Sequence, residues 1–493
     1  MSYIPLKLPP GIYRNGTEYQ SAGRWYDANL IRFFENTMRP INGWQKRSTT
    51  QMSGSPRGII SWRDNSNNRW VAIGTHSKLY VMNSGTTIKD ITPTGFTTGS
   101  ANAVGTTGYG YGSYGASTYG TPRADTGAVT YATTWSLDNW GEYMVGCSSS
   151  DGKLYEWQLG FSTPTVAAAI VNAPVGCKGL LSTSERFIFA LGADSNPRKV
   201  SWCDQENNTV WTPAATNQAG SFELTTPGTI LCAKRVRGLN LIFTDVDVHT
   251  SQYIGNPYVY SFEKAASGCG VISAQAVAAI DTAAIWMSRA GFWMYDGFVK
   301  PLASDVGDYV FNNINYNQQS KIYAVHLSKF GEIWWFYPSS SSNENDSYVT
   351  YNYRENHWNI GTLARTAGTD AGVFTTPLMM SSDGYLYEHE TGYAYDSATM
   401  YCQSGPIQIS NGDNVMNVRQ VIPDEQTLGE VEVSFTSRLF PTGSETTHGP
   451  YTAANPTSAR FTGRQVKMKV TSKVLADWRV GVMRLEAVLA GKR

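Results

Sequence analysis

Charged residues are scarce in this 493-residue chain, at 16% of the sequence against about 25% in an average globular protein. The 39 lysines and arginines are balanced by 39 aspartates and glutamates, so the net charge is zero. A protein that holds nucleic acid through its overall charge is strongly basic. The composition therefore argues against that class of protein.

Cysteine is sparse as well, and the cysteines are widely spaced. No two of them are closer than 26 residues, which rules out a C-x-x-C pair and zinc-ribbon spacing. We expect reduced and mostly buried thiols, in a protein made in a cytoplasm. The cysteines are at positions 147, 177, 203, 232, 269 and 402.

Long apolar runs and catalytic signatures are also missing. The best apolar run, 166–171, is far shorter than the roughly 18 residues that a membrane-spanning helix needs, and the opening MSYIPLKLPPG lacks the apolar core of a signal peptide. There is no G-x-S-x-G motif, and histidines number only six. The Asp-Gly pairs at 151–152 and 383–384 are adjacent, whereas the aspartate box of sialidase-type propellers has a residue between the two. We expect no membrane-spanning segment, no enzyme activity and no bound cofactor or metal.

Aromatic residues (13%) and glycines (47) are, by contrast, abundant, which is typical of a β-rich protein. The stretch 283–302 has the pattern strand, tight turn, strand, tight turn, strand, with Asp296-Gly297 in the second turn. Similar strand starts recur near residues 70, 143, 187, 241, 283, 332 and 377. A repeat of about 40–50 residues with several strands each is typical of propeller blades. The sequence predicts an all-β fold with a β-propeller of about six to seven blades over 58–400. The alternative is a large β-sandwich.

The two ends of the chain share a charge sign. Residues 1–57 hold eight basic and three acidic side chains, a net of +5, and 458–493 hold nine and two, a net of +7. The rest, 58–457, has a net of −12. The runs VEVSF and VKMKV alternate apolar and polar residues, as strands with one wet face do. We predict that 1–57 and 401–493 form one basic, β-sandwich-like platform beside the propeller.

A Gly/Tyr-rich insertion, 94–130, interrupts the first repeat. It contains a G-x-G-x-x-G match at Gly110, but this has no strand before it and no helix after it, so we reject a dinucleotide site. The insertion is either a flexible surface loop or a contact loop in which Tyr109, Tyr111 and Tyr114 meet a partner. We favour the contact loop.

Two local patterns lead to further predictions. We predict a short helix from Ser304 to Ile314, because its apolar residues fall on one helical face and Ser304 is a suitable N-cap. In TDVDVH, Asp245, Asp247 and His249 alternate on one face of a strand, where they could form a metal or acid–base site. The alternative, which we favour, is a solvated strand face with the two valines in the core.

Several segments resemble the tail hub, or nozzle, proteins of short-tailed bacteriophages. The resemblance covers most of the chain outside the insertion. It rests on structural motifs, so it carries over no catalytic residues. Among the segments are RWYDANLIRF, PINGW, GNPYVYSFEKAASGCGVIS, AIWMSRAGFWMYDGFVKPL, GEIWWFYPSSSSNENDSYVTYNYRENHWNIGTLART, DGYLYEHE, ETTHGPYTAANPTSARFTGRQVKMKVTS and DWRVGVMRLEAVLAGKR.

This resemblance implies a propeller-bearing structural protein of the virion tail, assembled in the bacterial host cytoplasm. Six copies would form a homohexameric ring below the portal and its adaptor, carry tail fibres or spikes, and conduct DNA during ejection. The contact with DNA would be transient and non-specific. The net negative charge of the central part agrees with this, because a conduit lined by cations would bind the phosphates strongly and hold the DNA. A propeller-type glycosidase or lectin that acts on host polysaccharide is the alternative.

The shared positive charge of the two ends suggests that the platform docks on an acidic surface. We expect Arg24, Arg32, Arg464 and Lys467 to be available to such a partner. The alternative is that these charges are simply solvated. Trp25, with Phe33 and Trp44, would pack against the C-terminal strands near Trp478.

Overall fold

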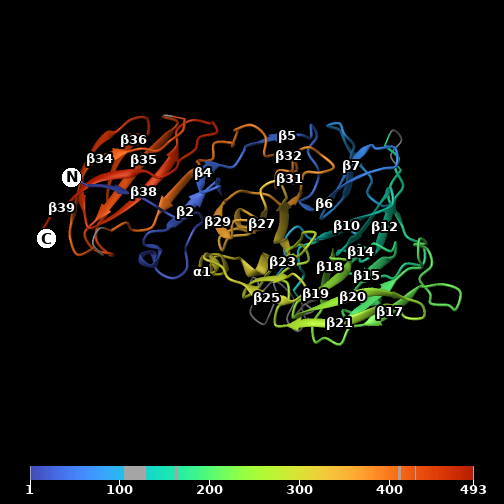
Figure 1. Ribbon diagram of the computed structural model, residues 1–493. Coiled ribbons are helices and arrows are strands. Elements are labelled where there is room, and N and C mark those ends of the chain that lie inside the picture. Colours follow the sequence, from blue (N-terminus) through green and yellow to red (C-terminus); the bar gives the residue numbers. More distant parts are fainter. Residues whose placement is uncertain (1, 105–128, 162–164, 409–411, 428, 492–493) are drawn as a thin grey trace, which may run out of the picture.

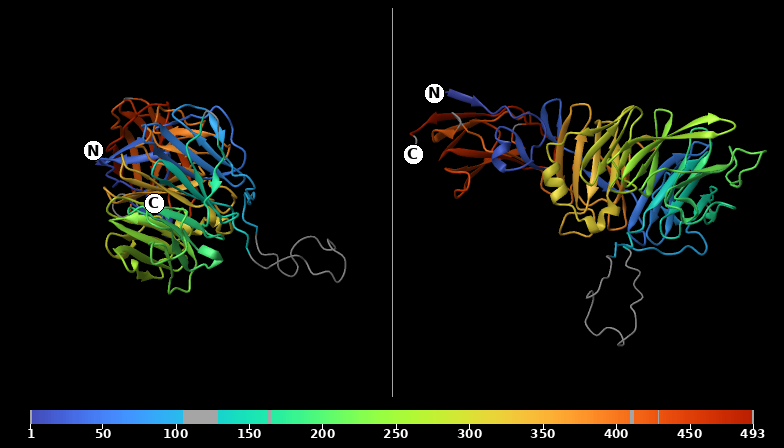
Figure 2. Two further views of the ribbon diagram at one scale, coloured as in Figure 1. Left: turned by 90° about the vertical axis from the view of Figure 1, so that its right-hand side faces the viewer. Right: turned by 90° about the horizontal axis from the view of Figure 1, so that it is seen from below.

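The protein folds almost entirely into β-strands, as the computed structural model shows (Figure 1). A large body lies beside a smaller end unit, and both chain termini lie at the tip of the end unit away from the body (Figures 1 and 2). The structure describes residues 2–104, 129–161, 165–408, 412–427 and 429–491.

Seven antiparallel four-stranded sheets make up the described body and follow one another along the chain. Sheet by sheet, the strands are β6 (Pro56–Arg63), β7 (Arg69–Thr75), β8 (Leu79–Met82), β9 (Ile88–Asp90); β10 (Trp135–Trp140), β11 (Tyr143–Ser148), β12 (Leu154–Trp157), β13 (Ala168–Ala169); β14 (Gly179–Ser182), β15 (Ile188–Leu191), β16 (Lys199–Trp202), β17 (Gly220–Glu223); β18 (Ile230–Val236), β19 (Leu239–Thr244), β20 (Asp247–Gly255), β21 (Val259–Ser267); β22 (Val277–Ala279), β23 (Ala284–Ser288), β24 (Gly291–Tyr295), β25 (Val299–Leu302); β26 (Tyr323–Leu327), β27 (Glu332–Tyr337), β28 (Ser347–Asn352), β29 (His357–Thr362); and β30 (Ala367–Thr369), β31 (Leu378–Met380), β32 (Leu386–His389), β5 (Trp44–Lys46).

The first strands of these sheets touch one another in a closed circle. Strand β6 contacts β10, and the contacts continue through β14, β18, β22 and β26 to β30, which returns to β6. Sheets arranged in this way stand around a common axis, which is the arrangement of a β-propeller-like fold. The all-β prediction is confirmed.

Each strand start predicted from the sequence lies in or next to the second strand of a sheet, from β7 to β31. The second strand is paired on both edges and covered on both faces. In β23 and β27, for example, every residue is buried. Such strands are continuously apolar or aromatic, so they stand out in the sequence.

The seventh sheet takes its outer strand from the N-terminal part of the chain. Strand β5 pairs with β32, with Trp44 opposite His389 and Lys46 opposite Tyr387. Residues 44–46 thus belong to the body, although the sequence analysis placed them in the platform segment 1–57. The pairing joins the two ends of the body's chain in one sheet.

Two further sheets form the end unit, and both combine N-terminal and C-terminal strands. Phe435 of one sheet stacks on Phe461 of the other at 5.3 Å between ring centres. The first, in strand order, has β2 (Trp25–Asn29), β33 (Tyr401–Ser404), β38 (Gln465–Ser472), β35 (Val431–Arg438) and β36 (Thr446–Thr452). The second has β1 (Ser2–Pro5), β39 (Arg484–Leu489), β34 (Met416–Ile422) and β37 (Thr457–Gly463).

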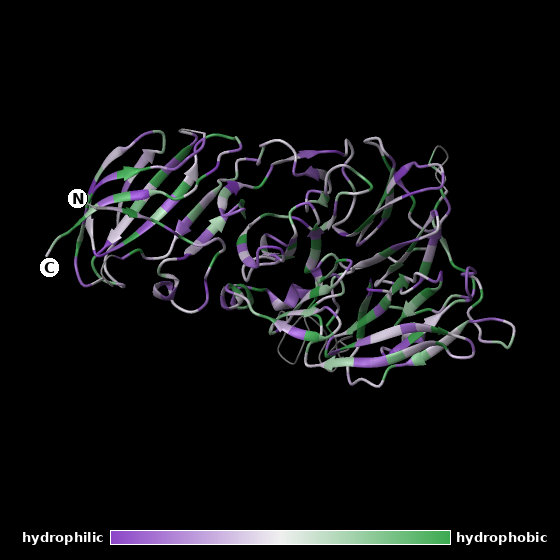
Figure 3. Ribbon diagram, viewed as in Figure 1, coloured by the Kyte–Doolittle hydropathy of each residue, from purple (hydrophilic) through white to green (hydrophobic). Residues whose placement is uncertain are grey.

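The end-unit strands alternate between hydrophobic and hydrophilic residues, whereas many strands of the body are hydrophobic along their length (Figure 3). In β35 and β38 buried and partly exposed residues alternate. The two runs singled out in the sequence therefore do have one wet face.

The remaining elements are short. Helix α1 is shorter than predicted, because Ser304 accepts a hydrogen bond from the amide of Val306 instead of capping the helix, and Asn15 accepts the Asp308 amide at 3.0 Å. The elements are the hairpin β3 (Ile31–Phe34) and β4 (Thr37–Pro40), helix α1 (Gly307–Asn312), and the 3-10 turns η1 (Glu18–Ser21), η2 (Ala193–Ser195) and η3 (Tyr316–Lys321).

Trp135 packs the first two sheets of the body together. Its indole Nε1 donates to the carbonyl of Thr75 at 2.7 Å. A Cβ on Gly74 would lie 2.3 Å from the indole, and one on Gly58 would lie 2.8 Å from the Trp135 Cβ. Glycine at both positions lets the strands approach the ring.

All six cysteines are buried and free, which confirms their predicted burial.

Candidate functional sites

Arg32, one of the cations predicted to face a partner, is instead buried inside this chain. Its guanidinium contacts Glu332 at 2.7 and 2.9 Å and Glu390 at 2.8 and 3.1 Å, and it lies 3.5 Å from the ring centre of Phe330. Burial alone would lower the pKa of Arg32, but the two carboxylates outweigh it and raise the pKa. The side chain is 1% exposed, so no partner can reach it.

Arg24 connects the end unit to the body, and Trp25 packs on the hairpin of β3 and β4. Arg24 forms an ion pair with Asp305 at 3.0 Å and stays partly exposed. Trp25 is buried and its ring packs on Phe33 at 6.1 Å. Trp44 was expected to pack near Trp478. It instead stacks on His389 and meets the ring of Tyr395 edge-on.

Lys467 is held in a network between the two ends of the chain. Its ammonium group contacts Glu18 at 3.0 Å and Glu445 at 2.6 Å, and Arg438 contacts the same two carboxylates at 2.9 and 3.1 Å. Burial would raise the pKa of Glu18, but hydrogen bonds from Lys467 and then Arg438 lower it overall. Only 11% of the Lys467 side chain is exposed, so it is engaged within the chain and not presented to a partner.

Arg464 lies at the rim of a surface hollow in the end unit. Its guanidinium is 5.4 Å from the ring centre of Phe440, which is 58% exposed. The hollow also contains Tyr19, from the N-terminal segment, and Leu439. Of the four cations predicted to dock, Arg24 and Arg464 therefore remain partly accessible.

The tyrosines of the insertion, Tyr109, Tyr111 and Tyr114, lie outside the described residues. The two sides of the insertion meet where Val104 and Thr130 form an antiparallel bridge. We call the described residues 100–104, just before the undescribed part of the insertion, the stem. The Gln318 side-chain oxygen accepts a hydrogen bond from the Ala103 N–H, and the Gln318 side-chain nitrogen donates one to the Ala103 carbonyl.

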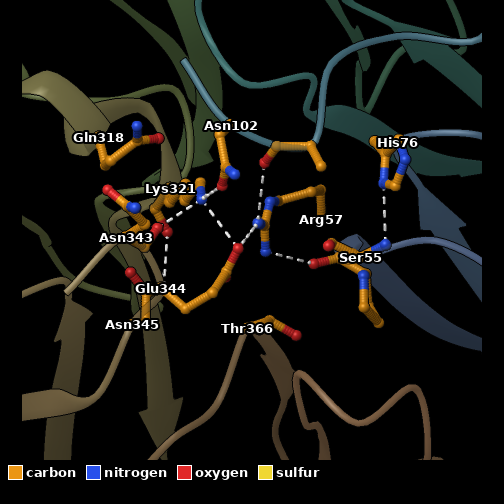
Figure 4. Close-up of polar contacts among 12 residues, drawn as sticks. Ser55, Arg57, His76, Asn102, Gln318, Lys321, Asn343, Glu344, Asn345 and Thr366 are labelled. Atoms are coloured by element: carbon orange, nitrogen blue, oxygen red, sulfur yellow. Dashed lines mark hydrogen bonds and ion pairs between the residues drawn. The ribbon is translucent and has the colours of Figure 1, made fainter. Parts of the chain in front are cut away.

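A buried ion network supports the stem (Figure 4). Glu344 accepts from Arg57 at 2.6 Å and from Lys321 at 2.8 Å. The same cations reach the stem, Arg57 at the carbonyl of Ala101 (3.3 Å) and Lys321 at the side chain of Asn102 (2.5 Å). Both cations are at most 1% exposed, whereas Glu344 is 30% exposed. The network thus places two buried positive charges on one carboxylate.

Asp247 and His249 form a buried cluster in the fourth sheet. The Asp247 carboxylate accepts from Thr226 and Thr244, forms an ion pair with Lys264 at 2.8 Å and lies 3.2 Å from the His249 ring. Burial would raise the pKa of Asp247, but these hydrogen bonds, that of Lys264 first, lower it. The aspartate is satisfied by the chain itself.

Asp245 and Val246 turn outward instead, because a tight turn from Thr244 to Asp247 precedes the strand. Val246 is 37% exposed, so the favoured alternative of both valines in the core holds only for Val248. Within the described part of the chain, no cluster of three or more His, Cys, Asp or Glu side chains could hold a metal ion.

A cavity of about 360 Å³ lies on the axis of the body, where the first strands meet. Asp138 lies in it, with Arg235 at 3.2 Å. This cavity cannot admit a duplex, whose major groove alone is about 12 Å wide.

Sequence reasoning missed the acidic partners of these networks, Glu332, Glu344 and Glu390. Nothing local marks them, since Glu332 is 300 residues from Arg32 in the chain and Glu344 is 287 from Arg57. It also did not single out Arg419, Arg460 and Arg484, which are exposed on the end unit.

Acid is expected to destabilise the protein below about pH 6.5, because five of its six histidines are buried to some degree in their neutral form. Burial lowers the pKa of each of His76, His249, His326, His357 and His389. A histidine whose folded pKa is depressed contributes fully above its unfolded pKa of about 6.5. That contribution is lost as the pH falls, at up to about 1.4 kcal/mol per pH unit for each of the buried His249, His357 and His389. The partly exposed His76 and His326 contribute less because water screens them.

His389→Gln should isolate one share of this effect. Burial and then the neighbouring Arg365 hold the pKa of His389 well below its usual value, and its Nε2 accepts from Arg365 at 2.7 Å. Glutamine keeps an acceptor but cannot titrate. Urea midpoints at pH 7.5 and 5.5 should differ less for the variant than for the wild type. Equal differences would contradict the assignment.

No family model matches this chain, and no curated protein matches it either. Among solved structures, a match is found to PorZ, described as an essential bacterial surface component of the type-IX secretion system of Porphyromonas gingivalis. The TM-score is 0.37 at 7% identity, and the match covers 76% of this chain and 44% of that chain. A similarity this distant carries no functional argument.

None of the helices in the described residues is both long and apolar enough to span a membrane.

Proposed function

We propose that this chain is a structural subunit of a ring-shaped tail nozzle of a short-tailed bacteriophage, in which a platform docks on the portal-adaptor and a seven-bladed propeller surrounds the outlet. The observation that carries the proposal is the pairing of the two chain ends in the end unit. Strand β1 pairs with β39, and β2 pairs with β33. The chain leaves the end unit, forms the body and then returns to the end unit. An assembly that binds the end unit can therefore hold the body as a projection.

The conduit for DNA lies between copies of the chain in this proposal. The axis cavity of about 360 Å³ is far too small for a duplex, so a channel requires several chains around a common axis. Closed rings of identical subunits follow from a repeated heterologous contact. We propose a homohexamer, with acidic residues of the body toward the channel, tail fibres or spikes outside, and only transient contact with DNA.

The proposed role is structural and located in the virion tail. Purified particles should contain the 54.2 kDa chain in several copies per tail. Antibody labelling should place it below the head in electron micrographs, and image averaging of the tail should show six copies around the axis. A control antibody against a capsid protein should label the head only.

Two outcomes would overturn the proposal. One is absence of the chain from purified particles. The other is a monomeric protein that cleaves host polysaccharide, measured as new reducing ends or lost viscosity, which would identify a propeller-type glycosidase.

A further inference from the structure

Nine cations of the two chain ends form ion pairs within the chain, but four exposed cations of the end unit do not. Lys7, Arg419, Arg460 and Arg484 are exposed and form no ion pair with any residue that the structure describes. The paired ones are Arg14, Arg24, Arg32, Arg47, Arg57, Arg438, Lys467, Lys473 and Arg479. These four exposed cations all belong to the sheet β1-β39-β34-β37 or follow it directly. Lys469 of the other sheet also forms no ion pair with the described residues, but it is partly buried and lies over the ring of Tyr401.

The arginines of this sheet point away from its core. In β34 Val418 and Val421 are buried, in β37 Ala459 and Phe461, and in β39 Leu485 and Ala487. Side chains alternate between the faces of a strand. Arg419, Arg460 and Arg484 therefore share the outer face, which we call the basic face, with Lys7 at its edge.

Two of the arginines lie side by side on neighbouring strands. A bulge places Arg419 between the pairs Val418↔Phe461 and Gln420↔Ser458, which puts it next to Arg460. Like charges at such positions destabilise a sheet. No carboxylate within the described residues comes within ion-pair distance of either arginine. The repulsion between the two arginines lowers the stability of the isolated chain. A partner that offers carboxylates would relieve this repulsion.

The rest of the basic face resembles a protein interface more than a track for phosphates. Tyr3 is 51% exposed, and Tyr and Arg are the residues enriched at the centres of protein interfaces. Glu486 lies in the middle of the face, opposite Tyr3 and Gln420, and is 9% exposed. A carboxylate there disfavours a continuous track of phosphates across the sheet, whereas a folded partner can offer it a donor.

The position of the basic face also leaves it accessible. Strand β39 and both chain termini lie at the tip of the molecule, at the far side from the body (Figures 1 and 2). A large partner can approach this tip without meeting the body.

We propose that the basic face binds an acidic surface of a folded partner protein through Arg419, Arg460 and Arg484, with Lys7 contributing at the edge. This moves the docking site from Arg32 and Lys467, which are engaged internally, to a sheet that the sequence analysis did not single out. Only the identification of the partner as the portal-adaptor rests on the proposed function.

The first test measures binding of the full chain to immobilised poly-L-glutamate at about 50 mM salt, where charge attraction is weakly screened. The variant Arg419→Glu/Arg460→Glu/Arg484→Glu should bind at least about tenfold more weakly, because it places like charges across the contact. A control variant with the same charge change, Arg63→Glu/Lys153→Glu/Lys329→Glu, alters exposed body residues that form no ion pair with the described residues and should bind like the wild type. Equal binding by both variants would overturn the proposal.

Folding and the nature of the ligand are checked separately. The single change Arg460→Gln removes the repulsion with Arg419, so its unfolding midpoint should match or exceed that of the wild type while its binding to poly-L-glutamate falls. A 20-base-pair duplex serves as the competing probe. Tighter binding of this duplex than of poly-L-glutamate, lost in the triple variant, would show a nucleic-acid site and overturn the protein partner.

The second test adds the purified chain to particles made without it. Attachment of the wild type and the control variant, with loss of attachment by the triple arginine variant, supports both proposals. Attachment of all three proteins overturns the basic face and leaves the nozzle function standing. Failure of all three to attach, with selective binding to poly-L-glutamate intact, overturns the nozzle function and leaves the basic face standing.

Discussion

Replacing Arg32 with methionine is expected to lower the free energy of unfolding by about 3–5 kcal/mol, the usual cost of removing one partner from a buried ion pair. The change leaves Glu332 and Glu390 with no cation, and both are nearly as buried as Arg32, at 5% and 6% exposure. Neighbouring carboxylates in a site with little water cannot both stay charged without a large cost. Methionine fills much of the volume, so the loss reports charge more than packing.

Guanidinium chloride unfolding measures the change, and two variants control it. Arg198→Met removes an arginine from a pair with Glu223 in which both side chains are 45–49% exposed, and it should cost less than about 1 kcal/mol. Adding Glu332→Gln and Glu390→Gln to Arg32→Met should recover part of the loss. A loss below about 1 kcal/mol for Arg32→Met alone would show that the network is not needed for stability.

Glu344→Gln is expected to destabilise the protein more than Lys321→Met does, although both break the same contact. The network holds Arg57 and Lys321 against one carboxylate, and both cations are at most 1% exposed. Glutamine at 344 leaves two buried cations facing each other, whereas methionine at 321 leaves a matched pair. Burial and then Arg57 lower the pKa of Lys321, which shows that its charge is already disfavoured.

The expected loss is about 3–5 kcal/mol for Glu344→Gln, reduced by the water that reaches the partly exposed Glu344. Lys321→Met should lose at least 1 kcal/mol less. Because the network bonds Ala101 and Asn102, amide hydrogen exchange in 100–104 should also rise in Glu344→Gln. The opposite order of the two variants would contradict the unequal charge balance. Unchanged exchange in 100–104 would separate the network from the stem of the insertion.

The positions of the strands could be predicted from the sequence because burial is recorded locally. The runs AAIWMS and EIWWFYP are apolar or aromatic along their length since β23 and β27 are covered on both faces. VEVSF and VKMKV alternate since β35 and β38 are covered on one face. The wide spacing of the cysteines likewise pointed to buried thiols rather than a metal site, and all six are buried.

The partners of the charges were decided only by the tertiary structure. Net charge counts every cation of a segment equally, but Arg32 meets carboxylates 300 and 358 residues away, while Arg460 has no carboxylate within ion-pair distance among the described residues. Two residues can form an ion pair however far apart they lie in the chain. No local pattern therefore distinguishes a buried arginine from an exposed one. The same holds for β5, whose three residues look like part of the N-terminal segment until β32 offers them an edge. The sequence alone determined which segments are strands and how each is covered, and long-range contacts determined which strands and charges meet.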